Sequence, residues 1–249
     1  MKKTLTLLIC LLSISVFAQV NQTDAKGKKQ GAWEKVYPGT RVFMYRGKFK
    51  NDKPIGTFVY FYKSGKSKAV IEHSETSRSQ GYFYHESGGV MSYGIYNDLK
   101  KDSIWVNWDK TGRLSSRESY QNDLLHGMKV IYYLAPIGDR SQRPMTVYNY
   151  KNGQLHGEFK EYFENGKTKN SGGYENGKKI GVWESYHAGG VRMSLVRYKN
   201  GQRHGWCIGY STKGKEEGRQ YYYYGRILQG KELKKKMTEL KRLGINPNE

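Results

Sequence analysis

Three histidines invite a metal-binding interpretation of this 249-residue chain, because imidazole is a common ligand of zinc. His126, His156 and His204 each stand directly before a glycine that begins one copy of an internal repeat. If every copy contributes two strands, histidines in neighbouring copies lie roughly 10 Å apart, which is two strand spacings. That separation is too large for a shared ion, so we predict no metal site.

Other reactive side chains lack the neighbours that catalysis needs. Cys207 has no sequence-local context for a nucleophile, and no serine stands in a Gly-x-Ser-x-Gly sequence. The adjacent carboxylates Glu216 and Glu217 fall near a predicted turn, where solvation is the ordinary explanation. Phosphate-binding loops are absent as well, because predicted hairpin turns account for the abundant glycines. We therefore predict no catalytic residues and no cofactor.

Tyrosines are the side chains whose spacing suggests a surface. Five of them recur at one position of the repeat and would form a ladder across stacked hairpins. Such a ladder is either the packed spine of the sheet or, beside lysines, an exposed face that stacks on sugar rings or anchors a protein partner. Both alternatives remain open, and the candidate interaction face consists of Tyr120, Tyr150, Tyr174, Tyr198 and Tyr222.

A repeat of about 24 residues must position these side chains. From Gly157 an aromatic residue follows after two positions and a tyrosine after five, and the same series begins again at Gly181. A period of this length is typical of one supersecondary unit stacked on its neighbours. We count about eight units, which start at Gly31, Gly56, Gln80, Ser103, Gly127, Gly157, Gly181 and Gly205.

Each unit carries two turn signals. Glycine stands nine residues after the start in six of the eight units, and glycine accepts the positive φ of a tight hairpin turn. Most units then end in Asn-Gly or Asn-Asp, as at Asn176 and Asn200. Two turns leave two strands of roughly six residues, rich in aromatic and β-branched side chains. The pattern predicts an all-β fold over residues 31–230, an elongated array of antiparallel β-hairpins in a single twisted sheet.

Two segments depart from the repeat. After Tyr133, unit five carries six extra residues at a hairpin tip, which are either a tolerated loop or an insertion at a binding edge. In the C-terminal segment 231–249, Leu233, Met237 and Leu240 recur at helical spacing among lysines. This pattern predicts a short amphipathic helix from Lys231 to Leu243 that caps the last hairpin, with membrane association as the alternative.

The N-terminus has the pattern of a secretory signal peptide. Two lysines precede a short apolar run, and small residues end at Ala18, so we predict cleavage between Ala18 and Gln19. A membrane anchor is the alternative, but the apolar run is shorter than the ~20 residues that a bilayer needs, and no other segment could span one. Residues 19–30 read as a flexible polar leader. We expect an exported protein that is periplasmic, cell-surface-associated or secreted.

Export also bears on the cysteines and the charge. Removal of Cys10 leaves Cys207 alone, so no internal disulfide can form, and this thiol is either buried or pairs between molecules. The net charge of +21 becomes +19 once Lys2 and Lys3 are removed. Such an excess attracts anionic lipid, acidic glycan or an acidic protein, and export disfavours nucleic acid. The alternative is that Lys and Arg fill the solvated positions of a thin sheet.

The segment from Tyr174 to Tyr186, Tyr-Glu-Asn-Gly-Lys-Lys-Ile-Gly-Val-Trp-Glu-Ser-Tyr, resembles the MORN repeat (membrane occupation and recognition nexus) in its bacterial variant form. The segments 150–157 and 198–205 are similar to it, and the resemblance covers about residues 31–230. Gln80 and Ser103 replace the start glycine, and Lys129 and Cys207 replace the aromatic residue that follows it. The resemblance implies an elongated stack of antiparallel hairpins that serves as an interaction module, with some members proposed to contact acidic phospholipids and bacterial variants described as antitoxin-like.

Our first functional hypothesis is a non-enzymatic, exported protein-interaction module with an acidic protein partner, antitoxin-like or immunity-like in its sharpest version. The alternative is a cell-envelope binding module that uses a basic, tyrosine-rich face on anionic lipid or glycan and weakens with salt. An enzyme is the third hypothesis, and it would require a cleft with convergent carboxylates or a metal.

Overall fold

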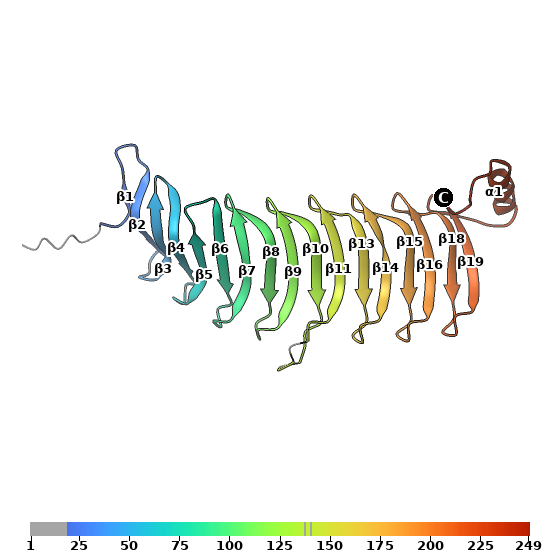
Figure 1. The fold of residues 1–249 in the computed structure, drawn as a ribbon, viewed down its shortest axis with the longest axis horizontal. Helices are drawn as coiled ribbons and strands as arrows, with labels where there is room; N and C mark the ends of the chain where they lie inside the picture. The colour runs from blue at the N-terminus through green and yellow to red at the C-terminus, as the bar shows by residue number, and fades with distance from the viewer. Residues whose placement is uncertain (1–18, 137, 140) are drawn as a thin grey trace, which may run out of the picture.

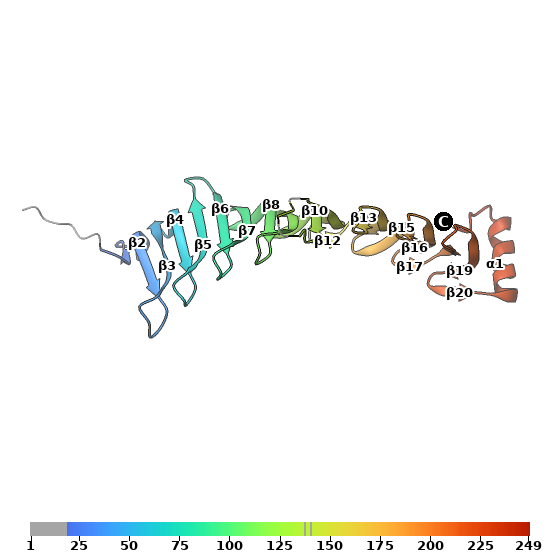
Figure 2. The same ribbon diagram turned by 90° about the horizontal axis from the view of Figure 1, so that it is seen from below.

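The computed structural model describes residues 19–136, 138–139 and 141–249. It forms one long, narrow antiparallel sheet with a helix at its C-terminal end (Figure 1), and the array twists along its length (Figure 2). The predicted all-β hairpin array is confirmed. The predicted signal peptide, residues 1–18 including Ala18, lies outside the described residues, and Gln19 is exposed.

The strands follow one another as a meander, each paired antiparallel with the next along the chain. The short strands β12 and β17 are the first parts of interrupted strands, because β11 pairs with both β12 and β13, and β16 with both β17 and β18. The strands are β1 (Gln22–Thr23), β2 (Lys29–Val36), β3 (Phe43–Lys50), β4 (Lys53–Phe61), β5 (Ser67–His73), β6 (Arg78–Tyr84), β7 (Val90–Asn97), β8 (Lys100–Trp108), β9 (Leu114–Gln121), β10 (Leu124–Tyr132), β11 (Pro144–Lys151), β12 (Gln154–Leu155), β13 (Gly157–Tyr162), β14 (Thr168–Glu175), β15 (Lys178–Tyr186), β16 (Arg192–Lys199), β17 (Gln202–Arg203), β18 (Gly205–Tyr210), β19 (Glu216–Tyr223) and β20 (Arg226–Leu228).

A bulge at the start position bends the first strand of a unit. Between β14 and β15 the pairing passes from Ser171↔Glu184 to Gly173↔Ile180, so β15 contains two more residues than its partner over this stretch. Gly181 lies within the extra stretch at φ 65°. Such a bulge increases local twist, and its left-handed backbone favours glycine. Ser103 adopts φ 59° at the same position of unit four, although it is not glycine.

In units two, four, six and seven, one face of the sheet buries the aromatic residue that stands two positions after the start, whereas the corresponding Tyr82 of unit three lies on the opposite face. Phe58, Trp105, Phe159 and Trp183 are the large buried side chains of this face, which we call the ring face. Room for the rings comes from glycines on the preceding strand: a Cβ atom at Gly47, Gly94 or Gly172 would overlap the ring of Phe58, Trp105 or Trp183, respectively. A single layer of sheet therefore buries indole rings by laying them flat over bare backbone.

The opposite face carries a continuous row of directly paired residues, one from each long strand from β2 to β19. Successive pairing partners show that the row is largely aliphatic and aromatic from Val59 to Val147, becomes polar at Lys160, Ser171 and Glu184, and then continues with Leu195 and Ile208. We call this side the valine face. Its principal members are Val59, Val70, Tyr82, Tyr93, Val106, Val130 and Val147.

The turn that ends each unit bonds to the unit before it. The Gly177 N–H donates to the Leu155 carbonyl at 2.8 Å, Gly201 donates to Lys179 at 2.9 Å, and Gly225 donates to Arg203 at 2.8 Å. The same bond recurs in earlier units from Asp52, Asp123 and Gly153. These bonds couple each hairpin to its neighbour, as the stacking of repeat units requires.

Helix α1 (Gly230–Arg242) lies within one residue of the predicted helix at both ends. Leu240 of the helix is buried in a cluster with Tyr221 and Leu228, and Leu233 and Met237 pack against that cluster. Trp206, the cross-strand partner of Tyr221, packs there too. Because Trp206 and Tyr221 alternate with Cys207 and Gln220, and share their side with Ile208 and Arg219, the helix covers the end of the valine face.

The N-terminal leader differs from the prediction, because part of it forms the first hairpin. Gln22 pairs with Gln30 and Thr23 with Lys29. The Asp24 carboxylate closes the connecting turn by accepting hydrogen bonds from the backbone N–H groups of Lys26 at 2.9 Å and Lys28 at 3.0 Å. This Asx-type turn is a local signal that the absence of apolar periodicity obscured.

Candidate functional site

The five predicted tyrosines all lie on the ring face, where each is half-buried. They do not form a continuous ladder of contacts with one another. Tyr174 packs edge-on between Phe159 and Trp183, with ring centroids 6.0 and 5.0 Å away, and Tyr198 lies 6.1 Å from Trp183. Tyr120 and Tyr150 contact Trp105 and Tyr148, and the Arg203 guanidinium lies over Tyr222. The tyrosines thus alternate with the buried rings in one mixed aromatic spine.

Lysines cover the outer side of this spine. The Lys179 ammonium lies 3.9 Å from the centre of the Trp183 ring and 5.2 Å from that of Tyr198. Lys101 occupies the same place over Trp105 and Tyr120, at 4.2 and 4.9 Å. These cation–π contacts and the packed lysine stems shield the rings from solvent.

The spine is interrupted between units four and five. Lys129 replaces the buried ring there, and Glu118 stands where units four and seven have glycine beneath the ring; the two side chains form an ion pair of 3.0 Å. The Tyr120 hydroxyl also donates to Glu118, at 2.7 Å. Burial raises the pKa of Glu118, but the bonds from Tyr120 and Lys129 outweigh it and leave this pKa below its ordinary value. Burial and the bond to Glu118 raise the pKa of the Tyr120 hydroxyl.

The three histidines pack beside turns. His126 Nδ1 lies 3.2 Å from the Asn152 side-chain oxygen, and the buried His204 Nδ1 accepts the Tyr224 N–H at 3.3 Å. His156 is half-buried, and its Nδ1 has no hydrogen-bond partner. Across the part of the chain that the structure describes, no group of three or more His, Cys, Asp or Glu residues could hold a metal ion.

The remaining reactive candidates are also separate from one another. Cys207 is a half-buried free thiol on β18, where its cross-strand partner is Gln220. Glu216 accepts two hydrogen bonds from the Arg219 guanidinium at 2.6 and 2.8 Å, and Glu217 is exposed. The predicted candidates therefore do not converge on one centre.

The structure adds a row of exposed apolar side chains that the sequence analysis missed. Ile104, Met128 and Val182 each follow the start residue of their unit, and 56%, 56% and 46% of their surface is exposed. They lie on the valine face, next to the central row, and we call them the exposed row. Glu158 occupies the same position in unit six, and Trp206 occupies it in unit eight, where helix α1 packs against it. Comparison of this one repeat position across units would have revealed the row.

A cleft of about 450 Å³ lies beside the insertion of unit five. Its apolar walls are formed by Trp108, Tyr132, Tyr133, Ala135 and Pro136, and Arg113, Gln142 and Thr111 supply polar groups. A second hollow of about 410 Å³ adjoins it across Trp108 and Gly112, lined by Tyr82, Val90 and Tyr93.

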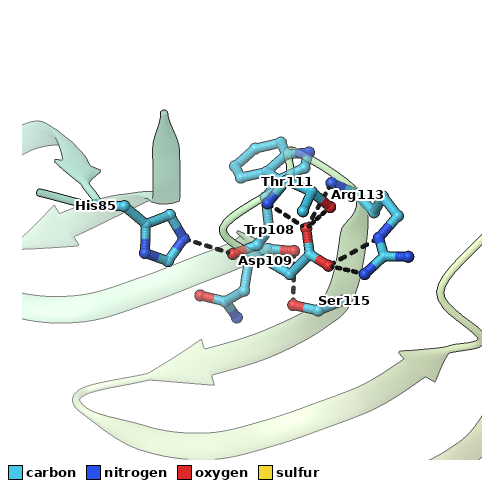
Figure 3. A network of polar contacts seen from close by, with 7 residues as sticks. His85, Trp108, Asp109, Thr111, Arg113 and Ser115 are labelled. Atoms are coloured by element: carbon cyan, nitrogen blue, oxygen red, sulfur yellow. Dashed lines mark hydrogen bonds and ion pairs between the residues drawn. The ribbon is translucent and has the colours of Figure 1, made fainter. Parts of the chain in front are cut away.

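The first cleft lies where a side-chain hydrogen bond between neighbouring units is replaced by hydrogen bonds within a single turn. In units one, two and five, the hydroxyl of the tyrosine after the first strand donates to the last carbonyl of the next unit's first strand: Tyr37 donates to Phe61 at 2.8 Å, Tyr62 to Tyr84 at 2.7 Å and Tyr133 to Tyr162 at 2.8 Å. His85 likewise bonds to the Trp108 carbonyl at 3.2 Å, as Figure 3 shows. In unit four this residue is Asp109, whose carboxylate turns back to accept bonds from Thr111 and Arg113 of its own turn (Figure 3).

Comparisons with known proteins identify no family. No protein-family model matches the sequence, and no curated protein matches it. In the residues that the structure describes, no helix has both the length and the apolar character needed to cross a membrane.

Among solved structures, the chain is similar to a crystal structure of TarM, with a TM-score of 0.29 and 14% identity over 42% of this chain and 20% of that one. It is also similar to a mutant of S. aureus TarM in complex with Fondaparinux, alpha-GlcNAc-glycerol and UDP, with a TM-score of 0.23 and 15% identity over 50% of this chain and 19% of that one. The chain thus spans about a fifth of the length of these structures, and at such TM-scores the likeness carries no functional conclusion.

Proposed function

We propose that this chain is a non-enzymatic, exported binding module that receives an acidic protein partner along the exposed row of its valine face. An antitoxin-like or immunity-like role, in which the partner is co-expressed with this chain, is the sharpest form of the proposal.

The observation that carries the proposal is the position of helix α1. The helix covers Trp206, which occupies in unit eight the repeat position that Ile104, Met128 and Val182 occupy in units four, five and seven. The chain itself thus provides an example of an apolar helix face packed on this side of the sheet. Exposed apolar side chains that continue from a covered cluster are typical of an interaction surface.

Charge favours an acidic partner. The chain has 43 Lys and Arg against 22 Asp and Glu. Arg197 is the direct cross-strand partner of Val182, and Arg117 and Lys160 belong to the adjacent central row of the valine face. Cations that border apolar side chains attract an acidic partner and set its orientation, while burial of the apolar groups supplies affinity.

The test combines recovery of a partner with a variant of the exposed row. Tagged chain is purified from its native compartment, and the dissociation constant of each recovered protein is measured by calorimetry. The triple change Ile104→Asp, Met128→Asp and Val182→Asp should weaken binding at least tenfold, because it removes apolar surface and repels an acidic partner. Leu99→Asp is the matched control, since Leu99 is 65% exposed but lies in a turn outside the row.

Two results contradict the proposal. One is the recovery of no protein partner from the periplasm, the cell surface or the medium. The other is a partner that binds the triple variant as tightly as the unaltered chain.

A further inference from the structure

We propose that the cleft between units four and five is a binding site for an acidic saccharide, with Trp108 as the platform for a sugar ring. This site is separate from the exposed row and independent of the protein-binding proposal. It lies at the opposite margin of the valine face, beside the turns Asp109–Gly112 and the insertion that follows Tyr133.

The cleft has a specific physical cause. A tyrosine or histidine at the position of Asp109 would extend toward the next unit and donate to the Tyr132 carbonyl, as His85 does to Trp108. Asp109 cannot, because its carboxylate accepts bonds from the Thr111 and Arg113 N–H groups at 2.9 and 3.0 Å and from the Arg113 Nε at 2.8 Å. Desolvation raises the pKa of Asp109, but these bonds outweigh it and leave the pKa below its ordinary value. The side chain is therefore ionised at neutral pH and has no proton to donate.

The walls of the cleft suit a ring-shaped ligand. Trp108 and Tyr132 supply aromatic surface, and Ala135 and Pro136, the described start of the insertion, form a third wall. The volume of about 450 Å³ falls within the range of about 300–1,000 Å³ that is usual for small-molecule sites. A pyranose ring presents an apolar face of C–H groups, which packs against an aromatic ring while its hydroxyls stay at the rim.

The polar groups at the rim favour a saccharide over a peptide. The Gln142 side-chain amide offers donors to sugar hydroxyls, and the Thr111 oxygen, whose hydrogen is donated to Asp109 at 2.7 Å, offers an acceptor. Peptide addition to a sheet would instead require an unpaired strand edge, and β8, β9 and β10 around the cleft are paired on both sides.

The Arg117 guanidinium beside the cleft gives the preference for an acidic sugar. It lies 6.0 Å from the centre of the Tyr132 ring, and its Nη2 donates to Gln142 at 3.1 Å. Arg113 also lines the cleft, but its Nε and Nη2 bond to the Asp109 carboxylate at 2.8 and 2.7 Å, and the carboxylate of the lining residue Asp139 accepts bonds from Ser141. Guanidinium recognises carboxylate and sulfate groups through paired hydrogen bonds. The second hollow, formed by Tyr82, Val90 and Tyr93 on the other side of Trp108, offers room for a further sugar unit.

The experiment measures binding of two oligosaccharides to the full chain by calorimetry. A hyaluronan hexasaccharide is the acidic probe, and a hexamer of N-acetylglucosamine is the neutral probe. The acidic probe should bind more tightly, and added salt should reduce that preference. Trp108→Ala should weaken binding of the acidic probe at least tenfold, whereas Trp33→Ala, which removes a tryptophan from the first unit, should leave it unchanged.

A second variant tests the cause of the cleft without removing its aromatic wall. Asp109→His introduces the residue found at the equivalent position of unit three, so it should restore the lateral bond to Tyr132 and close the cleft. We expect it to abolish saccharide binding while the thermal unfolding midpoint stays within a few degrees of that of the unaltered chain. Because Trp108→Ala and Asp109→His act in different ways, failure of one variant to fold leaves the other as a test.

Three results overturn the proposal: neither probe binds the folded chain, both variants bind the acidic probe as the unaltered chain does, or the cleft takes a peptide that neither saccharide displaces.

Discussion

Individual residues keep the role of their repeat position even when the residue type changes. Lys129 stands where other units bury a ring, and Glu118 stands eleven residues before it, as Gly94 and Gly172 stand before Trp105 and Trp183. The two departures are complementary, because the carboxylate fills the space above the strand and pairs with the ammonium at 3.0 Å. A ring over glycine is thus exchanged for an ion pair that occupies the same place.

This ion pair predicts an acid-sensitive component of stability. The pKa of Glu118 is lower in the folded chain than its ordinary value of 4.5, so its ionised form stabilises the fold at pH above that value. The contribution is lost as pH falls below 4.5 and through the folded pKa, because the carboxyl must then be protonated. Glu118→Gln should therefore reduce the free energy of unfolding at pH 7 by more than it does at pH 3, as measured by urea unfolding.

Glu158→Gln is the matched control for this prediction, because Glu158 lies on the next hairpin with 77% of its side chain exposed. Its substitution should reduce stability by no more than about 0.5 kcal/mol at either pH. Equal losses of stability in Glu118→Gln at pH 7 and pH 3 would show that the carboxylate charge plays no part.

The sequence predicted only some of the residue contacts in the candidate site. The spacing of Tyr120, Tyr174 and Tyr198 placed them on one side of the sheet, but their contacts depend on which ring lies beside them in the neighbouring strand. The role of Asp109 was hidden for a different reason. Its effect comes from a hydrogen bond that it cannot make to Tyr132, and such a loss is visible only after the units are superimposed on one another.

Hairpins are the elements in which sequence and structure correspond most closely. Glycine nine residues after the start and Asn-Gly at the end of the unit predicted both turns, because each residue type suits the left-handed backbone found there, as at Gly166 and Asn176. Strand register within a unit was less predictable. The two extra residues beside Gly181 depend on how the bent strand meets its neighbour, and no residue type alone specifies that bulge.

The glycines beneath the rings give a prediction at the scale of the hairpin. Gly172 has no left-handed backbone conformation, so alanine is allowed there by the main chain, but its Cβ would overlap the Trp183 ring. Gly172→Ala should therefore destabilise the fold by about 1–3 kcal/mol, the usual cost of overpacking. Urea unfolding followed by tryptophan fluorescence measures the change.

Gly218→Ala is the control for this substitution. Gly218 also lies on the second strand of a hairpin, and a Cβ atom there would meet nothing within 4 Å. This variant should be neutral or slightly stabilising, because alanine restricts the unfolded chain. If both variants lose the same stability, the cost comes from the strand and not from the ring.

The whole molecule is a single-layer sheet whose two faces bury their apolar side chains in different ways. The ring face buries its aromatic side chains along its own length, whereas helix α1 covers the C-terminal end of the valine face (Figure 1). Each hairpin contacts mainly its immediate neighbours, so stability is expected to propagate along the array from unit to unit. The helical spacing of Leu233, Met237 and Leu240 predicted the helix, but which face it covers depends on the bulge that precedes Trp206.

Helix α1 should therefore protect the end of the array more than its middle. A chain that stops after Gln229 exposes Tyr221 and Leu228, which are 1% and 4% exposed in the complete chain. Hydrogen exchange should accelerate strongly in β18, β19 and β20, and only slightly in β4 to β9, because nearest-neighbour coupling weakens along the array. The truncated chain should also self-associate through the uncovered apolar cluster, which sedimentation velocity would detect.

Leu240→Asp is a milder form of the same change and should accelerate exchange in the same three strands. Equal acceleration along the entire sheet would instead indicate one cooperative unit, and unchanged exchange in β18 to β20 would show that the helix does not cap the array.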